Sequence, residues 1–234
     1  MRPLLPFALA AGLFAAGLAR DAADLWIDRT VLPPLTVVTG VEVTARDGTL
    51  LRAFTVADGR WRLEPGAVDP GFLAMLVAYE DKRFYRHGGV DAIALLRAAG
   101  QAAAAGRVVS GGSTLTMQVA RLIEGSGTGR LAGKLRQIRV ALALERRLTK
   151  DQILGLYLRL APYGGNLEGI RAATLAWFGK EPRRLTPAES ALLVALPQSP
   201  ETRRPDRAPA AAAAARARVL ARLADEGALD ADRA

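Results

Sequence analysis

Helix signals recur along this chain from residue 69 onward, and they constrain the fold more than any other feature of the sequence. Asp69 and Asp91 each stand where a side-chain oxygen can accept the first backbone N–H groups of a helix, and Gly106 can end the second helix. The segments TKDQ at Thr149 and TPAE at Thr186 match the capping box, a reciprocal contact that closes a helix start. The sequence therefore predicts a mainly α-helical fold.

A small β-structure is expected before these helices. Residues 41–55 alternate or carry β-branched side chains around Asp47-Gly48, a pair that favours a tight turn between two strands. At the other end, residues 209–226 are rich in Ala and Arg and predict a terminal helix. We expect one helical domain with an N-terminal β-hairpin appendage.

The N-terminal residues are typical of an export signal. The chain is uncharged from residue 3 to residue 19, a length between a signal-peptide core and a full membrane span. Trp26 is suited to a membrane interface. We expect residues 1–20 to form an uncleaved signal-anchor and residues 21–40 to be a linker; a cleaved signal peptide is the alternative.

Composition narrows the class of function. The chain has no cysteine and one histidine, which excludes disulfides, thiolate metal sites and multi-histidine metal sites. Its formal net charge is +9, which favours an anionic partner such as nucleic acid, anionic lipid or a phosphorylated substrate. Because the N-terminus predicts export, we expect the basic surface to face a membrane.

A cluster of charge ends the first helix of the domain. Phe72, Met75 and Leu76 have the spacing of a buried helix face, and the segment EDKRFYRH, from Glu80 to His87, follows them directly. One interpretation is a solvated corner where the helix leaves the core. The other is an acid or base group at the mouth of a cleft.

The segment from Val108 to Gly125 has the elements of an anion site. Gly111 and Gly112 allow close backbone approach, and Ser113 is expected to cap the helix that follows. Thr114, Gln118 and Arg121 share one face of that helix. Together with free N–H groups at the helix start they predict a cradle for phosphate or pyrophosphate; an ordinary capped helix is the alternative.

The next helix carries a carboxylate on its apolar side. Leu135, Ile138 and Leu142 continue a stripe from Leu131, and Glu145 lies on it. Such a carboxylate is either paired with a base, here expected to be an arginine, or poised for function. The rest of the helix bears a basic row, which suits an anion-rich partner or is a solvated face. Its members are Arg136, Arg139, Arg146 and Arg147.

Four ordered segments resemble a known family. They are EDKRFYRHGGVD, GGSTLTMQVAR, LERRLTKDQILGLYL and AATLAWFGKEPRRLTPAESALLVALPQSP. In order and spacing they resemble the peptidoglycan glycosyltransferase domain of glycosyltransferase family 51, over roughly residues 40–228. The segments GRVVSGGSTLTMQVAR and APYGG are similar to those of the 1C type of class A penicillin-binding proteins.

The resemblance implies a lysozyme-like helical fold for residues 41–228 and a specific reaction. The domain would be a glycan-chain polymerase that moves a lipid-pyrophosphate-linked glycan, with inversion, to the 4-hydroxyl of the N-acetylglucosamine of lipid II. Glu80 would be the general base. His87, Asp81 and Phe84 would be structural. The leaving pyrophosphate would be bound by Ser113, Thr114, Gln118, Arg121, Lys134 and Gln137.

The third family motif is altered in this chain. It reads Arg-Lys-x-x-Glu in most of the family, and here Gly133 and Gln137 replace the Arg and the Glu, while Lys134 is kept. An amide can orient a ligand but cannot titrate. Arg159 likewise replaces the family's Asn. These changes call the strength of the polymerase activity into question.

The resemblance also implies partners and a location. Lipid II, the lipid-linked glycan strand, the membrane and cell-wall synthesis proteins are the expected partners, with no nucleic acid. The expected location is the inner membrane, single-pass, with the domain on the periplasmic face. No cofactor is required and no metal site is certain, although carboxylates are able to hold Mg²⁺ or Mn²⁺. Residues 229–234 are expected to be a tail, at the chain end or before a missing transpeptidase.

Three other functions compete with this one. A lysozyme-like lytic enzyme would share the helical fold and one catalytic Glu but would not need an anion cradle. A non-catalytic cell-wall scaffold is favoured by Gln137 and Gly133. A basic membrane- or nucleic-acid-binding domain is disfavoured by the export segment and by the few aromatic residues among the basic ones.

Overall fold

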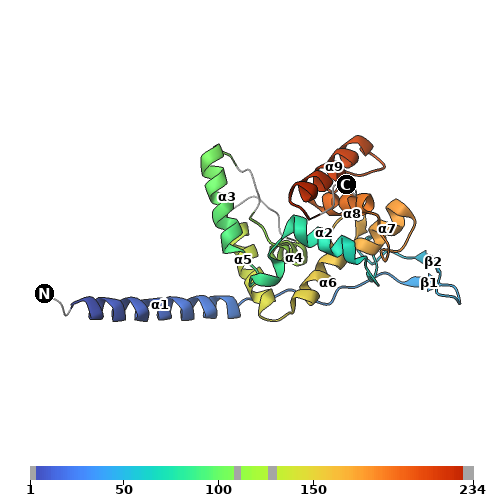
Figure 1. Ribbon diagram of the computed structural model, residues 1–234. Helices are drawn as coiled ribbons and strands as arrows, with labels where there is room; N and C mark the ends of the chain where they lie inside the picture. Colours follow the sequence, from blue (N-terminus) through green and yellow to red (C-terminus); the bar gives the residue numbers. More distant parts are fainter. Residues whose placement is uncertain (1–3, 108–111, 126–130, 229–234) are drawn as a thin grey trace.

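The computed structural model describes residues 4–107, 112–125 and 131–228, and most of them are helical (Figure 1). The helices are α1 (Leu4–Asp28), α2 (Pro70–Glu80), α3 (Ala92–Ala105), α4 (Leu115–Glu124), α5 (Leu131–Glu145), α6 (Lys150–Leu160), α7 (Ile170–Phe178), α8 (Pro187–Ala195) and α9 (Pro209–Asp225). Two short 3₁₀ turns, η1 (Phe84–Arg86) and η2 (Leu196–Gln198), complete the helical part. The mainly α prediction is confirmed. The expected tail, residues 229–234, lies outside the described residues.

The predicted caps explain where most helices begin. The Asp69 carboxylate accepts from the N–H groups of residues 71 and 72, and Asp91 accepts from that of residue 94. Thr149 and Thr186 both form complete capping boxes. The prediction for α4 was wrong by one residue, because the Thr114 hydroxyl, not that of Ser113, accepts the N–H of Met117. Ser113 is thereby left free to face the pocket described below.

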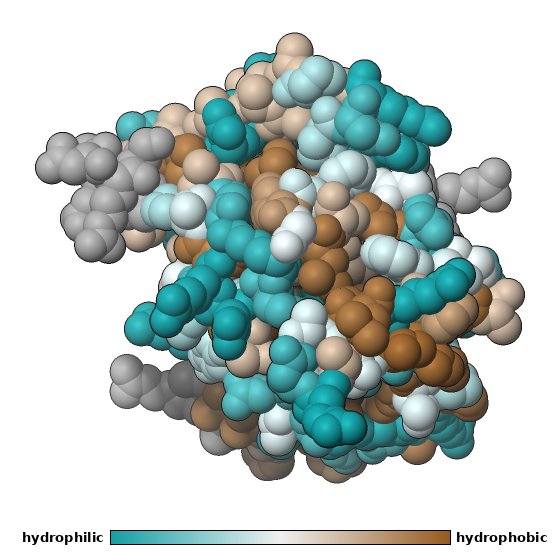
Figure 2. Space-filling model, turned by 90° about the vertical axis from the view of Figure 1, so that its right-hand side faces the viewer, coloured by the Kyte–Doolittle hydropathy of each residue, from teal (hydrophilic) through white to brown (hydrophobic). Residues whose placement is uncertain are grey.

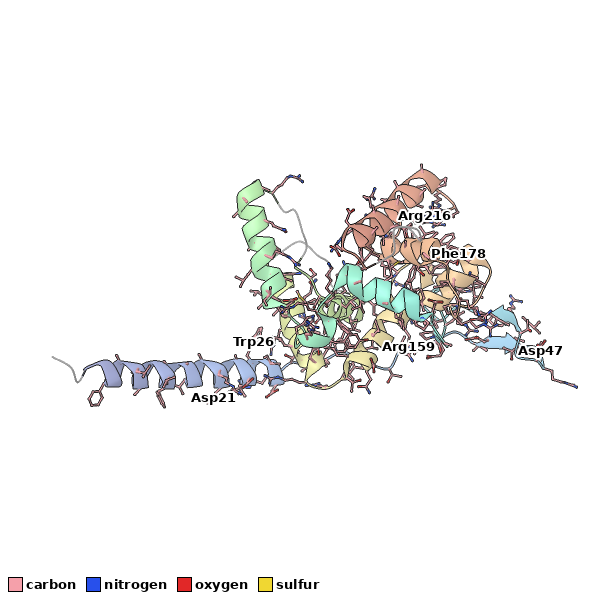
Figure 3. The ribbon with its side chains drawn as sticks, in the orientation of Figure 1. Asp21, Trp26, Asp47, Arg159, Phe178 and Arg216 are labelled. Atoms are coloured by element: carbon pink, nitrogen blue, oxygen red, sulfur yellow. The ribbon has the colours of Figure 1, made fainter. Side chains whose placement is uncertain are left out.

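The β-structure is small and only partly predicted. The expected hairpin forms from β1 (Glu42–Thr44) and β2 (Leu50–Ala53), and Gly48 takes a left-handed φ of 86° in its turn. Figure 3 shows Asp47 near the tip of this projecting hairpin. The pairing of β3 (Trp61–Arg62) with β4 (Leu167–Glu168) was not predicted. It joins segments distant in sequence, and the buried Glu168 accepts hydrogen bonds from Arg60 and Arg62 at its edge.

Helix α4 lies in the interior of the domain. It contacts α5 and α6, while α2 packs on α8 and α9 packs on α8. The side chains of Leu115, Met117 and Val119 on α4 are 0–1% exposed, as is Phe72 on α2. Burial of this kind contributes about 1.5–3 kcal/mol for each large apolar side chain. The core therefore fixes α2 and α4 relative to each other.

Helix α1 extends away from the domain and is held to it at one end (Figure 1). The first part of the expected linker over residues 21–40 is helical, because α1 continues as far as Asp28. Arg139 on α5 donates to the Trp26 carbonyl at 2.9 Å and stacks on its ring, 5.0 Å from the centroid. Arg146 pairs with Asp24 and Asp28. These contacts continue the helix where the sequence predicts irregular chain.

The same contacts bear on the basic row, whose members Arg136 and Arg139 lie on α5 and whose members Arg146 and Arg147 follow it. Arg147 donates to the Thr30 carbonyl, and Arg136 pairs with Glu124. Each of the four arginines thus has a partner within this chain, while the Arg136 side chain stays 69% exposed. None of the helices among the described residues combines the length and hydrophobicity that a membrane span needs. The segment expected over residues 1–20 stays a prediction.

Hydrophobic side chains also reach the surface of the domain. Figure 2 views the end from which the hairpin projects, and brown hydrophobic groups gather there in a band between teal hydrophilic ones. The exposed hydrophobic residues in and beside the hairpin are Val41, Val43, Leu51 and Phe54. Arg52 lies over the Phe54 ring at 4.6 Å, so part of this surface is covered by a cation.

Candidate active site

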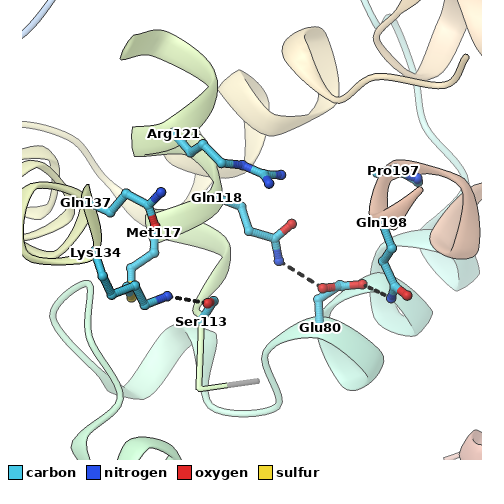
Figure 4. Close-up of a pocket in the computed structure, with 9 residues that line it drawn as sticks. All are labelled: Glu80, Ser113, Met117, Gln118, Arg121, Lys134, Gln137, Pro197 and Gln198. Atoms are coloured by element: carbon cyan, nitrogen blue, oxygen red, sulfur yellow. Dashed lines mark hydrogen bonds between the residues drawn. The ribbon is translucent and has the colours of Figure 1, made fainter. Parts of the chain in front are cut away.

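A pocket of about 400 Å³ lies where α2, α4, α5 and η2 meet (Figure 4). Glu80 enters it from the last position of α2, where the helix ends beside α4. The other residues that line the pocket are Ser113, Met117, Gln118, Arg121, Lys134, Gln137, Pro197 and Gln198. Sequence segments that are far apart are thus brought to one cavity.

Both carboxylate oxygens of Glu80 accept hydrogen bonds from amides. Gln118 Nε2 lies 2.8 Å from Oε2, and Gln198 Nε2 lies 2.7 Å from Oε1. Among the described residues, no ion pair to Glu80 is formed. Hydrogen bonds from neutral donors fix the carboxylate without cancelling its charge. The Glu80 carboxylate therefore has the fixed position that a general base needs, at the mouth of the pocket.

The opposite wall of the pocket is cationic. Lys134 Nζ donates to Ser113 Oγ at 2.5 Å, and within the described ranges neither Lys134 nor Arg121 pairs with a carboxylate. Burial lowers the pKa of Lys134, and the nearby Arg121 charge lowers it further. Two uncompensated cations in a concave site favour a bound anion. Gln137, 5% exposed, lies on the same wall and adds no negative charge.

Thr114 and Glu145 both make structural contacts outside this pocket. The Thr114 hydroxyl donates to the Gly89 carbonyl at 2.6 Å and caps α4, so it is buried outside this pocket. Glu145 pairs with Lys150 at 2.7 Å and accepts from Thr116 at 2.6 Å. The expected structural ion pair is formed, but its partner is a lysine and not the expected arginine. Residue 111 of the expected glycine loop lies outside the described residues.

Asp81 and His87 form a buried connection behind Glu80. His87 Nε2 lies 2.9 Å from Asp81 Oδ1, and both side chains are nearly inaccessible, at 4% and 3% exposure. Asp81 also accepts from the N–H of Leu115, the first residue of α4. The other ring nitrogen of His87 accepts from the N–H of Gly89. These bonds tie α2 to α4 and favour the structural role expected for both residues.

This connection predicts a large stability effect. Asp81→Ala leaves two buried donors without an acceptor, and each unpaired donor costs about 1–3 kcal/mol. We expect the free energy of unfolding to fall by about 3 kcal/mol, as measured by urea denaturation followed by circular dichroism. Asp151→Ala on the exposed start of α6 is the control, with an expected loss below about 1 kcal/mol. Equal losses in the two variants would contradict the assignment.

The lowered pKa of Lys134 predicts a pH-dependent cost. Because the folded state binds this proton less tightly than the unfolded state, the cost is fully present below the folded-state pKa and is relieved as pH rises through it. The Tm of Lys134→Met minus that of the wild type should therefore decrease between about pH 7 and about pH 10. Differential scanning fluorimetry measures this difference. A difference that stays constant over the range would contradict the buried-cation interpretation.

A second, larger pocket of about 710 Å³ meets the first at Glu80. Ser113, Gln118 and Gln198 also border both. Most cations in the second pocket are paired, Arg83 with Asp91 and Lys82 with Glu226. Among the described residues, the Glu80 carboxylate thus stands between a pocket whose cations have no carboxylate partner and a pocket in which most cations are paired.

Two residues near Glu80 were missed from the sequence. Gln198 lies in a segment without a periodic signal, and only the fold brings it to Glu80. Tyr157 on α6 is fully buried, and burial raises its pKa well above the usual value, with a further increase from the Glu80 charge. No group of three or more His, Cys, Asp or Glu side chains suited to a metal occurs among the described residues. Assistance by Mg²⁺ or Mn²⁺ stays a prediction.

Comparison with known proteins places the chain in a family. The family model described as Transglycosylase matches residues 47–224. The chain is 48% identical over 222 residues to penicillin-binding protein 1C of Escherichia coli (strain K12), covering 94% of this chain and 28% of that protein. It is 36% identical over 190 residues to penicillin-binding protein 1A of the same organism, covering 80% of this chain and 22% of that protein.

The chain therefore spans about a quarter of the length of these relatives. A crystal structure of penicillin-binding protein 1A from Haemophilus influenzae aligns with 87% of this chain and 20% of that chain, at a TM-score of 0.44 and 18% identity. Since the family model covers most of the residues that form the pocket and its supporting helices, the chain belongs to the transglycosylase family, glycosyltransferase family 51, and is similar to its 1C type.

Proposed function

We propose that this domain polymerises the glycan strands of peptidoglycan. The growing strand, linked to a lipid through pyrophosphate, would be transferred with inversion to the 4-hydroxyl of the N-acetylglucosamine of lipid II. One observation carries this proposal. A carboxylate held by two neutral amides faces two cations without carboxylate partners across one pocket.

The geometry supports separate roles for the carboxylate and for the two cations in the reaction. Glu80 accepts the proton of the 4-hydroxyl as that oxygen forms a bond to the anomeric carbon of the donor, which contributes about 10²- to 10⁴-fold to the rate. The bond from the anomeric carbon to the pyrophosphate oxygen breaks, and the pyrophosphate leaves with the electron pair. Arg121 and Lys134 stabilise its charge, so protonation of the leaving group is not required.

The two pockets that meet at Glu80 support separate places for the two substrates. The pocket with free cations suits the pyrophosphate of the donor. The larger pocket, where most of the cations are paired, suits the acceptor sugar, whose hydroxyl must reach Glu80 from the other side. A lytic enzyme would have no use for the cationic wall, and this disfavours the lysozyme-like alternative.

Gln137 favours one further possibility for the same domain. It lies on the cationic wall, where most family members have a carboxylate, and its side chain is neutral at all pH values. An amide here can orient the pyrophosphate, but it has no negative charge with which to hold a bridging cation as a carboxylate does. The natural chain is then either a polymerase tuned by this amide or a scaffold that binds lipid II without turnover.

We also propose a membrane location for the whole protein. The apolar side chains of α1 are exposed, including Phe7, Leu13 and Phe14 at 67–74%. A single-pass segment that includes this helix would hold the domain at the periplasmic face of the inner membrane. Lipid II, the nascent strand and cell-wall synthesis proteins would be its partners there.

The direct test is polymerisation of labelled lipid II by the detergent-solubilised chain. Products are resolved by glycan length, with and without moenomycin, for the wild type and for Gln137→Glu. Moenomycin-sensitive polymer from the wild type is expected. Polymer from Gln137→Glu alone would identify a weakened or partner-dependent enzyme. Lipid II binding without polymer from either protein would support the scaffold and contradict the polymerase.

A further inference from the structure

We propose that Gln198, with Arg203 behind it, is a positioning residue that holds Glu80 for proton transfer; this inference rests on the proposed function. Gln198 ends η2, which follows α8, and its Nε2 lies 2.7 Å from Glu80 Oε1. The two residues are separated by 118 positions in the chain. The contact therefore links the α8–α9 region to the end of α2.

Arg203 determines which end of the Gln198 amide faces Glu80. Arg203 Nη1 lies 3.1 Å from Gln198 Oε1 and 2.7 Å from the carbonyl oxygen of Ala195. A guanidinium only donates, so it requires the oxygen end of the amide. The nitrogen end must then point toward the carboxylate. Without Arg203 the amide can rotate and present its oxygen to Glu80, which is repulsive.

The second donor completes a fixed geometry around the carboxylate. Gln118 on α4 donates to the other oxygen of Glu80, and Gln198 comes from the opposite side of the pocket (Figure 4). A carboxylate has about four acceptor positions, so two amide bonds leave room for the hydroxyl that it must deprotonate. A lysine or arginine in either place would hold the carboxylate equally well but would weaken it as a base.

Substitution of Gln198 can lower either the catalytic rate or the stability of the fold, and the two effects can be distinguished. Removal of a hydrogen bond to a charged group corresponds to about a ten- to hundredfold change. If Gln198 acts by positioning the base, this loss appears in kcat while KM for lipid II stays within about twofold. A residue that only stabilises the fold would instead lower Tm and leave the activity of the folded fraction unchanged.

The experiment measures kcat and KM for lipid II polymerisation in five variants. They are Gln198→Ala, Arg203→Ala, their double variant, Gln198→Ala in the Glu80→Gln background, and Gln152→Ala. Gln152 has the same side chain in a capping box of α6 and is the control, expected to lower Tm only. Each single change at 198 or 203 should reduce kcat about ten- to hundredfold. The double variant should be no worse than the more severe single one.

Further loss from Gln198→Ala in the Glu80→Gln background, or an effect on KM alone, would overturn the proposal. A spectroscopic measurement keeps it testable if the wild type makes no polymer. The chain has five glutamines and one asparagine, so its side-chain amide signals are few enough to assign by ¹⁵N NMR. The Gln198 amide signals should shift in Glu80→Gln and in Arg203→Ala. Unchanged signals would overturn the positioning role, while shifted signals without polymer would leave only the proposed function in error.

Discussion

Glu80→Gln is expected to reduce lipid II polymerisation by about 10²- to 10⁴-fold, the contribution of one positioned general base. The substitution keeps the size of the side chain, but one of its two former acceptor atoms becomes a donor. Because Gln198 is oriented by Arg203, that contact cannot adapt without breaking another hydrogen bond. Steady-state assays of glycan length and initial rate measure the effect.

Lipid II binding separates this effect from a loss of folding. Glu80→Gln should bind lipid II within about threefold of the wild type, since the loss is confined to the transition state. Glu201→Gln, which replaces an exposed loop carboxylate that accepts from Gly165, should retain full activity. Rates for Glu80→Gln close to those of the wild type would rule out Glu80 as the base.

Arg121→Ala is expected to lower kcat by about 10²- to 10³-fold, the usual cost of removing one group that stabilises developing charge. Among the described residues, Arg121 makes no ion pair that would otherwise occupy it, so its charge is available to the leaving pyrophosphate. Arg121→Lys should recover part of the loss, because a lysine keeps the charge but not the planar, two-point contact.

A charge-matched control isolates the position of Arg121 from the net charge of the protein. Arg216→Ala removes an exposed arginine of α9, labelled in Figure 3, and should leave kcat unchanged. Inhibition by inorganic pyrophosphate gives a second measurement. Its inhibition constant should rise in Arg121→Ala but not in Arg216→Ala. Equal inhibition of the two variants would place the pyrophosphate elsewhere.

The helical part of the fold could be predicted because its signals are local. Asp69, Asp91, Thr149 and Thr186 each satisfy backbone groups within three residues of themselves, and this chemistry is visible in sequence. The β3–β4 pair and the continuation of α1 to Asp28 depend on contacts with residues more than a hundred positions away. No local pattern encodes them.

The residues of the candidate site likewise fall into those that local motifs predict and those that only the fold brings together. Glu80, Gln118, Arg121 and Lys134 were predicted from motifs, and the fold brings all four to one pocket. The roles of the two hydroxyl side chains were harder to predict, because Ser113 and Thr114 are adjacent and either can cap α4. Which one faces the pocket is decided by the hydrogen bond from Thr114 to the Gly89 carbonyl. Gln198 lies near the end of the fourth family-like segment, but nothing in that segment indicates a contact with Glu80, since this contact depends on where η2 lies.

The arginine contacts between α1 and α5 have a mechanical consequence. Arg139, which contacts the end of α1, stands on α5 together with Lys134 and Gln137, and Arg146, which also contacts α1, follows the end of that helix directly. A helix transmits rotation and axial displacement along its length with little loss. The depth and tilt of α1 in its surroundings would therefore affect the position of Lys134 and Gln137 in the pocket. A chimera that exchanges α1 but keeps residues 24–30 would preserve these arginine contacts. A chimera in which the foreign segment extends through Thr30 would lose them, and with them the coupling to α5.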